Sequence, residues 1–203
     1  MSTTTLSRYD LRIISDWITP ASKILDLGCG NGSLLKHLQN TKNTTGYGLE
    51  LNPQKITQCI DNGVNVIQTN LDKGLTYFDD DSFDFVILSL TLQAMRNPDT
   101  LLEEMLRVGR QGIVTFPNFG YWRNRLQIAI NGKMPVSGEL PYKWYDTPNI
   151  HLCTIHDFEN LCQQRGFTIE SSIAVHHSGK TNPGLKVLPN WFGEIALCRF
   201  SKT

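Results

Sequence analysis

The stretch Lys23–Ser33, with the sequence KILDLGCGNGS, constrains the fold of this chain more than any other. Residues 24–27 form a short, mainly apolar run of the kind found in a strand covered on both faces. Helical spacing resumes at Ser33, so a helix should start at the loop and aim its first N–H groups at a bound ligand. Between strand and helix lie three alternate glycines, Gly28, Gly30 and Gly32. This order predicts a nucleotide-binding loop.

Short apolar runs alternate with amphipathic stretches along most of the chain, which is the pattern of an α/β domain. The apolar runs predict strands at 24–27, 44–50, 64–68, 83–88, 111–116, 167–175 and 194–200. Helices are predicted at 6–18, from 33, and at 53–60, 98–109, 119–130 and 155–165. The alternation predicts a parallel sheet with helices on both faces. The last two strands, joined by a polar loop, are expected to form an antiparallel pair.

The length of the chain limits the number of domains. Its 203 residues are enough for one α/β domain with a substantial core and few for two, so a single domain over residues 1–203 is expected. The regular pattern stops at about 117–154, where aromatic and basic residues gather with prolines and glycines. We expect this stretch to be an elaborated region over one end of the sheet.

The composition argues against several kinds of partner. Nineteen basic and nineteen acidic residues give a formal net charge of zero, which leaves no electrostatic footprint for a nucleic acid or an anionic membrane. The five cysteines are scattered without a C-x-x-C pair, which argues against a disulfide framework and structural zinc. The sequence has no signal-peptide pattern and no apolar run near the roughly 20 residues of a membrane span. We expect a cytoplasmic protein without nucleic-acid, membrane or metal partners.

The residues around the loop narrow the ligand. A P-loop motif is absent, and the dinucleotide fingerprint would need a third glycine where Ser33 stands. The Asp26 carboxylate would repel a pyrophosphate and attract a ligand that carries an ammonium and a sulfonium, which points to S-adenosylmethionine. Glu50, at the end of the second strand, is placed to accept hydrogen bonds from ribose hydroxyls. The alternative for Glu50 is a solvated acid at a strand end.

Two segments resemble the class I S-adenosylmethionine-dependent methyltransferases: ILDLGCGNG at 24–32 looks like their motif I, and DSFDFVILS at 81–89 like their fourth-strand motif. The resemblance implies a Rossmann-like, seven-stranded sheet in the order 3-2-1-4-5-7-6. It also implies an Asp facing adenine after the third strand, where this chain has Asn70, whose amide can still pair with adenine. The candidate cofactor-binding residues are Asp26, Gly28, Cys29, Gly30, Gly32, Glu50, Leu51, Asn70, Leu71, Asp72 and Ser89.

A narrower resemblance, from about residue 8 to 200, is to the methionine biosynthesis protein family MetW. It rests on SLTLQA at 89–94, RVGR at 107–110, FPNFGYWRNR at 116–125 and WYDTPNIHLCT at 144–154. This resemblance implies a cytoplasmic S-adenosylmethionine-binding protein that acts with, or regulates, homoserine O-acyltransferase. The alternative is an S-adenosylmethionine-dependent methyltransferase that acts on an unidentified small-molecule acceptor.

No catalytic motif decides between these two functions. The Asn/Asp-Pro-Pro-Tyr/Phe motif of amino-methylating enzymes is absent after the fourth strand, and no Pro-Cys pair offers the nucleophile for cytosine methylation. His151 is a candidate general base and Asp146 or Tyr145 candidates to orient an acceptor, although His151 can equally hydrogen-bond the following helix. Another four residues are candidates either for acceptor binding or for a protein interface: Trp122, Arg123, Arg125 and Trp144.

Overall fold

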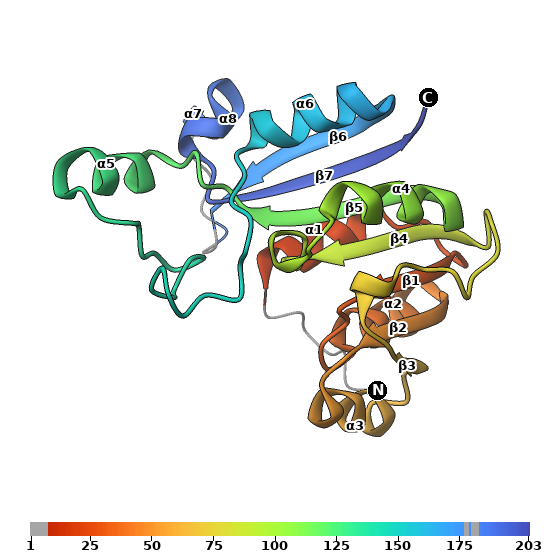
Figure 1. Ribbon diagram of the computed structural model, residues 1–203. Helices are drawn as coiled ribbons and strands as arrows, with labels where there is room; N and C mark the ends of the chain where they lie inside the picture. The colour runs from red at the N-terminus through yellow and green to blue at the C-terminus, as the bar shows by residue number, and fades with distance from the viewer. Residues whose placement is uncertain (1–7, 177–178, 180–182) are drawn as a thin grey trace.

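The computed structural model describes residues 8–176, 179 and 183–203, and its centre is one seven-stranded sheet in the order β3-β2-β1-β4-β5-β7-β6 (Figure 1). The pairs β1–β2, β2–β3, β1–β4 and β4–β5 are parallel, and β7 pairs antiparallel with both β5 and β6. The expected strand order and antiparallel pair are confirmed. The strands are β1 (Lys23–Leu27), β2 (Thr45–Glu50), β3 (Val66–Gln68), β4 (Phe83–Ser89), β5 (Gly109–Pro117), β6 (Phe167–Val175) and β7 (Ile195–Lys202).

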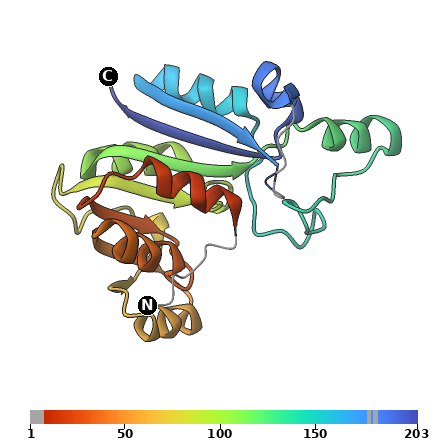
Figure 2. The same ribbon diagram turned by 180° about the vertical axis from the view of Figure 1, so that it is seen from behind.

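Helices cover both faces of the sheet, and on each face one apolar core lies between the helices and the sheet (Figures 1 and 2). One face is covered by α4 (Pro98–Val108) and α6 (Ile155–Arg165). The other is covered by α1 (Tyr9–Trp17) and α2 (Ser33–Lys42), with Cys59 of α3 (Pro53–Asp61) in the same core. The strands between them are apolar on both sides, which explains why they appear in the sequence as continuous apolar runs. The remaining helices are α5 (Trp122–Asn131), α7 (Pro183–Val187) and α8 (Pro189–Phe192), with single turns η1 (Leu71–Lys73) and η2 (Leu92–Ala94).

Local signals set the ends of α3 and α6. Asn52 caps α3 by accepting from two backbone N–H groups, and Gly63 follows that helix with a φ of +68°. Gly166 ends α6 in the left-handed conformation, and Thr154 with Asp157 forms a capping box at its start. These stops agree with the predicted ends.

Three predicted elements differ from the structure. The first helix begins at Tyr9, and Leu6 lies outside the described residues. The third strand starts at Val66, because Val64 is buried under the glycine loop and its N–H closes the turn after α3 on the Cys59 carbonyl. The expected polar loop before the last strand contains two short helices, α7 and α8.

The region 117–154 leaves the sheet as α5 and returns as a long segment (Figures 1 and 2). Between Gly132 and Thr154, all of which the structure describes, the chain has no helix or strand. Both views show α5 standing away from the sheet. The irregular region 117–154 therefore lies beyond one end of the sheet.

Candidate functional site

The carboxyl ends of the parallel strands bring the predicted cofactor residues together. Asp26 pairs in register with Gly48 of β2 and with Ile87 of β4, so Glu50 and Ser89 lie two residues further along the neighbouring strands. Ligands bind at this edge of open α/β sheets because the connecting loops diverge there. The candidate site is therefore formed by β1, β2 and β4 and by the loops that follow them.

The loop after β1 turns through its glycines. Gly28, Gly30 and Gly32 all have positive φ, between +60° and +74°, a conformation that other residues adopt at a cost. A side chain at Gly30 would meet nothing within 4 Å, so the space beside its backbone is open. Both Gly28 N–H and Cys29 N–H donate to the Leu49 carbonyl, at 2.8 and 3.0 Å. The loop thus lies against β2 and leaves room for a ligand on its open side.

Glu50 fastens this loop in addition to facing the site. Its buried carboxylate accepts from Gly30 N–H through Oε2 and from the Leu51 and Asn52 N–H groups through Oε1, each at 2.9 Å. A carboxylate has about four acceptor positions, so these donors leave about one for a ribose hydroxyl. Binding two hydroxyls would require the Gly30 bond to be exchanged.

Asp26 is buried directly before the glycine turn. Burial raises the pKa of its carboxyl to about 7, Arg8 acts in the opposite direction, and Glu50 raises it further. A cation brought next to Asp26 would favour the ionised form. The electrostatics therefore fit the ammonium or sulfonium expected from the sequence.

Two features of the site were not expected from the sequence. Arg8, at the start of α1, donates to Ser89 Oγ at 2.8 Å and forms an ion pair with Asp10. Leu90, directly after β4, has a φ of +52°, and its N–H donates to the Thr115 carbonyl at 2.9 Å. A bulky side chain in that conformation is strained, and such strain collects at functional sites. Neither feature has a local sequence signal, because both depend on contacts between residues far apart in the sequence.

A cavity of about 510 Å³ opens at Leu49 and Leu51, the residues on either side of Glu50, between the ends of β2 and β3 and the loop after η1. Its lining is mainly apolar and includes Leu51, Ile67, Tyr77 and Phe78, which suits a flat heteroaromatic ring. Asn70 also lines the cavity, and its side-chain oxygen caps η1 by accepting from Asp72 N–H at 3.0 Å.

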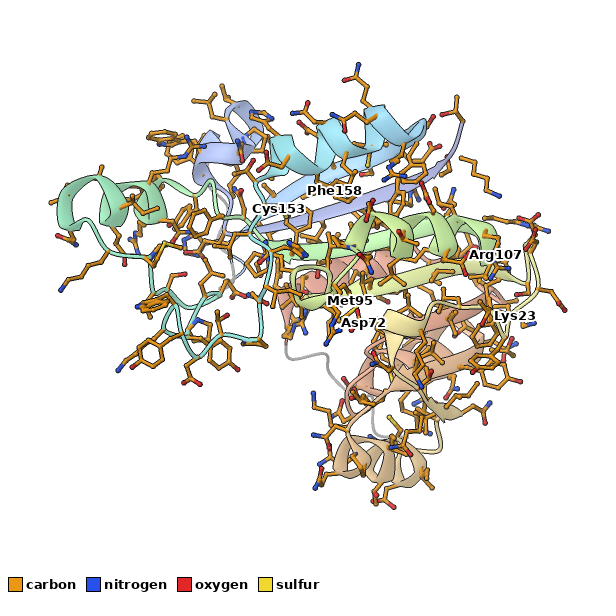
Figure 3. The ribbon with its side chains drawn as sticks, viewed as in Figure 1. Lys23, Asp72, Met95, Arg107, Cys153 and Phe158 are labelled. Atoms are coloured by element: carbon orange, nitrogen blue, oxygen red, sulfur yellow. The ribbon has the colours of Figure 1, made fainter. Side chains whose placement is uncertain are left out.

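The next two candidate cofactor residues, Leu71 and Asp72, do not line this cavity. Leu71 is buried in the core under α4, and Asp72 accepts from Arg96 N–H at 3.0 Å. Figure 3 shows Asp72 close to Met95, and the two residues line the same small cavity. Leu71 and Asp72 both line this separate cavity of about 50 Å³, which is too small for a nucleoside. Their predicted cofactor contact stays a prediction.

The wall formed by Tyr77 and Phe78 is tied to α4 through Arg107. The guanidinium donates to both oxygens of Glu104, to Asp80 and to the carbonyls of Leu75 and Phe78, at 2.7 to 3.1 Å. The hydrogen bond from Arg107 lowers the pKa of Glu104, and the same bond raises that of Arg107. This ion pair fixes the loop that closes the cavity (Arg107 is labelled in Figure 3).

Cys29 fills space inside the loop. Its sulfur lies 3.8 Å from that of Cys59, and burial raises the pKa of both thiols. A protonated, buried thiol is a poor nucleophile. The structure therefore fits the interpretation of Cys29 as a small packing residue.

The candidate catalytic residues lie apart from the glycine loop in the chain and are exposed. His151 shares a hydrogen bond with the Arg96 carbonyl at 3.2 Å, while Thr154 and Asp157 cap the helix that follows. Trp144 and Tyr145 pack edge to face, with ring centroids 5.5 Å apart, and Asp146 is exposed. Arg123 lies over the Trp122 ring, whereas Arg125 turns back to the Gly120 carbonyl and the Trp191 ring. Their catalytic or binding roles stay predictions.

Within the described ranges, no helix combines the length and apolarity needed to cross a bilayer. The same part of the chain contains no cluster of three or more His, Cys, Asp or Glu side chains arranged to hold a metal.

The fold resembles that of several solved enzymes. An S-adenosylmethionine dependent methyltransferase from Mesorhizobium loti superposes with a TM-score of 0.68 at 18% identity, over 95% of this chain and 96% of that one. The cyclase SpnF superposes with a TM-score of 0.66 at 16% identity, over 95% of this chain and 80% of that one. These similarities show the class I methyltransferase fold.

Sequence comparison identifies the family. The bifunctional methionine biosynthesis protein MetXA/MetW of Rhodopirellula baltica is 39% identical over 173 residues, which make up 81% of this chain and 28% of that protein. The chain thus spans less than a third of this relative's length. The family model of methionine biosynthesis protein MetW matches residues 8–200. Because that match covers nearly the whole chain, this protein belongs to the MetW family of methionine biosynthesis proteins.

Proposed function

We propose that this chain binds S-adenosylmethionine at the glycine loop and acts with homoserine O-acyltransferase as a cofactor-responsive subunit. The observation that carries the proposal is the Rhodopirellula relative, in which a MetW portion and a MetXA portion share one polypeptide. Two activities joined in one chain commonly work on the same pathway. S-adenosylmethionine is made from methionine, so its occupancy of this subunit would report the supply of the pathway's product.

The cofactor part of the proposal is supported by the chemistry of the site. Gly30 leaves open space, Asp26 favours a cation, Glu50 has an acceptor position for a ribose hydroxyl, and the adjacent cavity suits adenine. When bound, the cofactor would supply a sulfonium-activated methyl group. The chain's own residues would hold the nucleoside and orient the amino-acid end.

The regulatory part is supported by a short series of contacts from the glycine loop to the region 117–154. A Cβ at Gly28 would lie 3.0 Å from Thr91 Oγ1, and Gln93 follows two residues later in η2. The Gln93 carbonyl accepts from the N–H groups of Ile150 and His151, at 2.9 and 3.0 Å. A ligand that favours one arrangement of residues 89–93 would therefore bias the position of residues 150–151.

The test is a calorimetric titration with S-adenosylmethionine and S-adenosylhomocysteine, followed by acyltransferase kinetics with and without this chain and the ligand. Gly30→Arg should abolish ligand binding, because the side chain fills the open space. Gly166→Arg is the matched control, since Gly166 also has positive φ and open surroundings but caps α6. Its ligand affinity should equal that of the wild type.

Ligand binding without any complex or kinetic effect on the acyltransferase would contradict the partner assignment. Transfer of a labelled methyl group from the cofactor to a small molecule, seen with wild type and lost in Gly30→Arg, would establish the methyltransferase alternative instead.

A further inference from the structure

The region 117–154 carries large apolar side chains that the described part of the chain leaves exposed. Six large side chains define this outer surface: Ile130, Met134, Tyr142, Trp144, Tyr145 and Ile150, each 45% exposed or more. Ile130 is 72% exposed and Trp144 74%. Met134, Trp144 and Tyr145 line one cavity, and exposed apolar side chains that gather on a soluble domain mark sites where another molecule binds.

The outer surface is held in place although it lacks regular structure. Gln127 exchanges two hydrogen bonds with the backbone of Val136, and the Gln93 carbonyl holds residues 150–151. A cavity of about 610 Å³ opens between Met134 and the pair Trp144–Tyr145. An edge-to-face aromatic pair beside a cavity has the form of an interface hot spot.

The charges around the outer surface indicate which kind of partner surface is complementary to it. Residues 117–154 contain four basic and two acidic side chains, in a chain whose net charge is zero. Lys143 lies over the Tyr145 ring and Arg123 over the Trp122 ring, so cations flank the aromatic residues. The complementary partner is therefore apolar at its centre and acidic at its rim. A second copy of this chain fits less well, because a symmetric contact would bring the same basic residues together.

We propose that the outer surface is the docking surface for the homoserine O-acyltransferase, through an apolar patch of that enzyme rimmed by carboxylates. This proposal rests on the proposed function, which supplies the identity of the partner. The fused relative places a MetXA portion and a MetW portion in one molecule, so a contact between the two is the expected arrangement.

The experiment measures binding of the purified chain to purified acyltransferase by calorimetry and sedimentation, with two surface variants. Ile130→Glu and Trp144→Ala should each weaken the complex by at least about tenfold, because either one removes an apolar contact from the interface centre. Ile60→Glu is the matched control: Ile60 is also the second-last residue of a short helix and is 64% exposed, but it lies on α3. It should bind like the wild type, and all variants should keep S-adenosylmethionine affinity, which shows that they fold.

Each other outcome is distinct. Wild-type affinity in both surface variants would overturn the docking proposal and leave the proposed function intact. No complex with the wild type would overturn both. A wild-type dimer that Ile130→Glu dissociates would assign the surface to self-association, and wild-type binding to anionic vesicles that the variant loses would assign it to a membrane.

Discussion

Asp26 is the residue whose chemistry is most altered by the fold. Its pKa of about 7 lies well above that of an exposed Asp, because the carboxyl is buried. The native state therefore binds more protons than the unfolded state between about pH 4 and pH 7, and the free energy of unfolding falls as the pH rises through that window. Near neutral pH, the same carboxyl exchanges a proton for a ligand cation.

We predict that the affinity for S-adenosylmethionine falls by about tenfold from about pH 8 to about pH 6, as Asp26 becomes protonated. Asp26→Asn should bind more weakly at the higher pH and lose most of this dependence. The variant should also be more stable than the wild type above about pH 7, because it buries no charge. Titration calorimetry and thermal unfolding across this range measure both effects. An unchanged pH profile in Asp26→Asn would assign the dependence to another group.

At the scale of elements, two connections join the site to its surroundings. Arg107 holds the loop after η1, and the Gln93 carbonyl holds residues 150–151. We predict that Arg107→Ala destabilises the protein by about 2–3 kcal/mol, because it removes the donor to the carbonyls of Leu75 and Phe78 and leaves Glu104 with only the 3.3 Å bond from Leu75 N–H. The loss should shrink in acid, since the depressed pKa of Glu104 contributes stability only above its unfolded-state pKa.

Arg110→Ala is the control for this prediction. Arg110 is exposed and lies 3.6 Å from Asp84, so its removal should cost no more than about 0.5 kcal/mol. Denaturant unfolding at neutral and acid pH measures both variants. Equal losses for the two arginines would mean that the Glu104 network adds little.

The second connection leads to a prediction about coupling. Gln93→Ala removes the donor that the Pro117 carbonyl accepts from at 2.9 Å and should cost about 1–3 kcal/mol of stability. It should weaken acyltransferase binding more than S-adenosylmethionine binding, because the Gln93 side chain contacts Pro117 and Cys153, at the two ends of the region 117–154. Gln127→Ala, whose hydrogen bonds are exposed, should cost only a few tenths of a kcal/mol. Equal loss of both ligands in Gln93→Ala would indicate general unfolding.

At the scale of the whole molecule, the strands of the sheet could be predicted from the sequence, whereas several contacts and short helices around the sheet could not. Buried parallel strands leave continuous apolar runs, so the strands and their alternation with helices were readable from the sequence. Strand order came from the resemblance carried by ILDLGCGNG. The contacts of Arg8 with Ser89 and of Asp72 with Arg96 join residues distant in sequence, and no local pattern encodes them. The strained Leu90 and the helices α7 and α8 likewise depend on tertiary packing.

At the same scale, the fold does not determine the reaction. A methyltransferase and the cyclase SpnF share this architecture, so the arrangement of strands does not identify the chemistry. The family assignment comes from the sequence comparison. What the fold adds is the relative position of the candidate site at the sheet edge and the outer surface beyond the end of the sheet.

The irregular segment between Gly132 and Thr154 has a consequence for proteolysis. Few hydrogen bonds hold its backbone, so it should open locally at a small cost in free energy. Lys133 and Lys143 are exposed within it, and trypsin should cut there first. Because β5 and β7 pair across the cut, the nicked halves should stay together and retain S-adenosylmethionine while losing the acyltransferase. Prior addition of the acyltransferase should protect both lysines, so one digestion time course reports on the two activities separately.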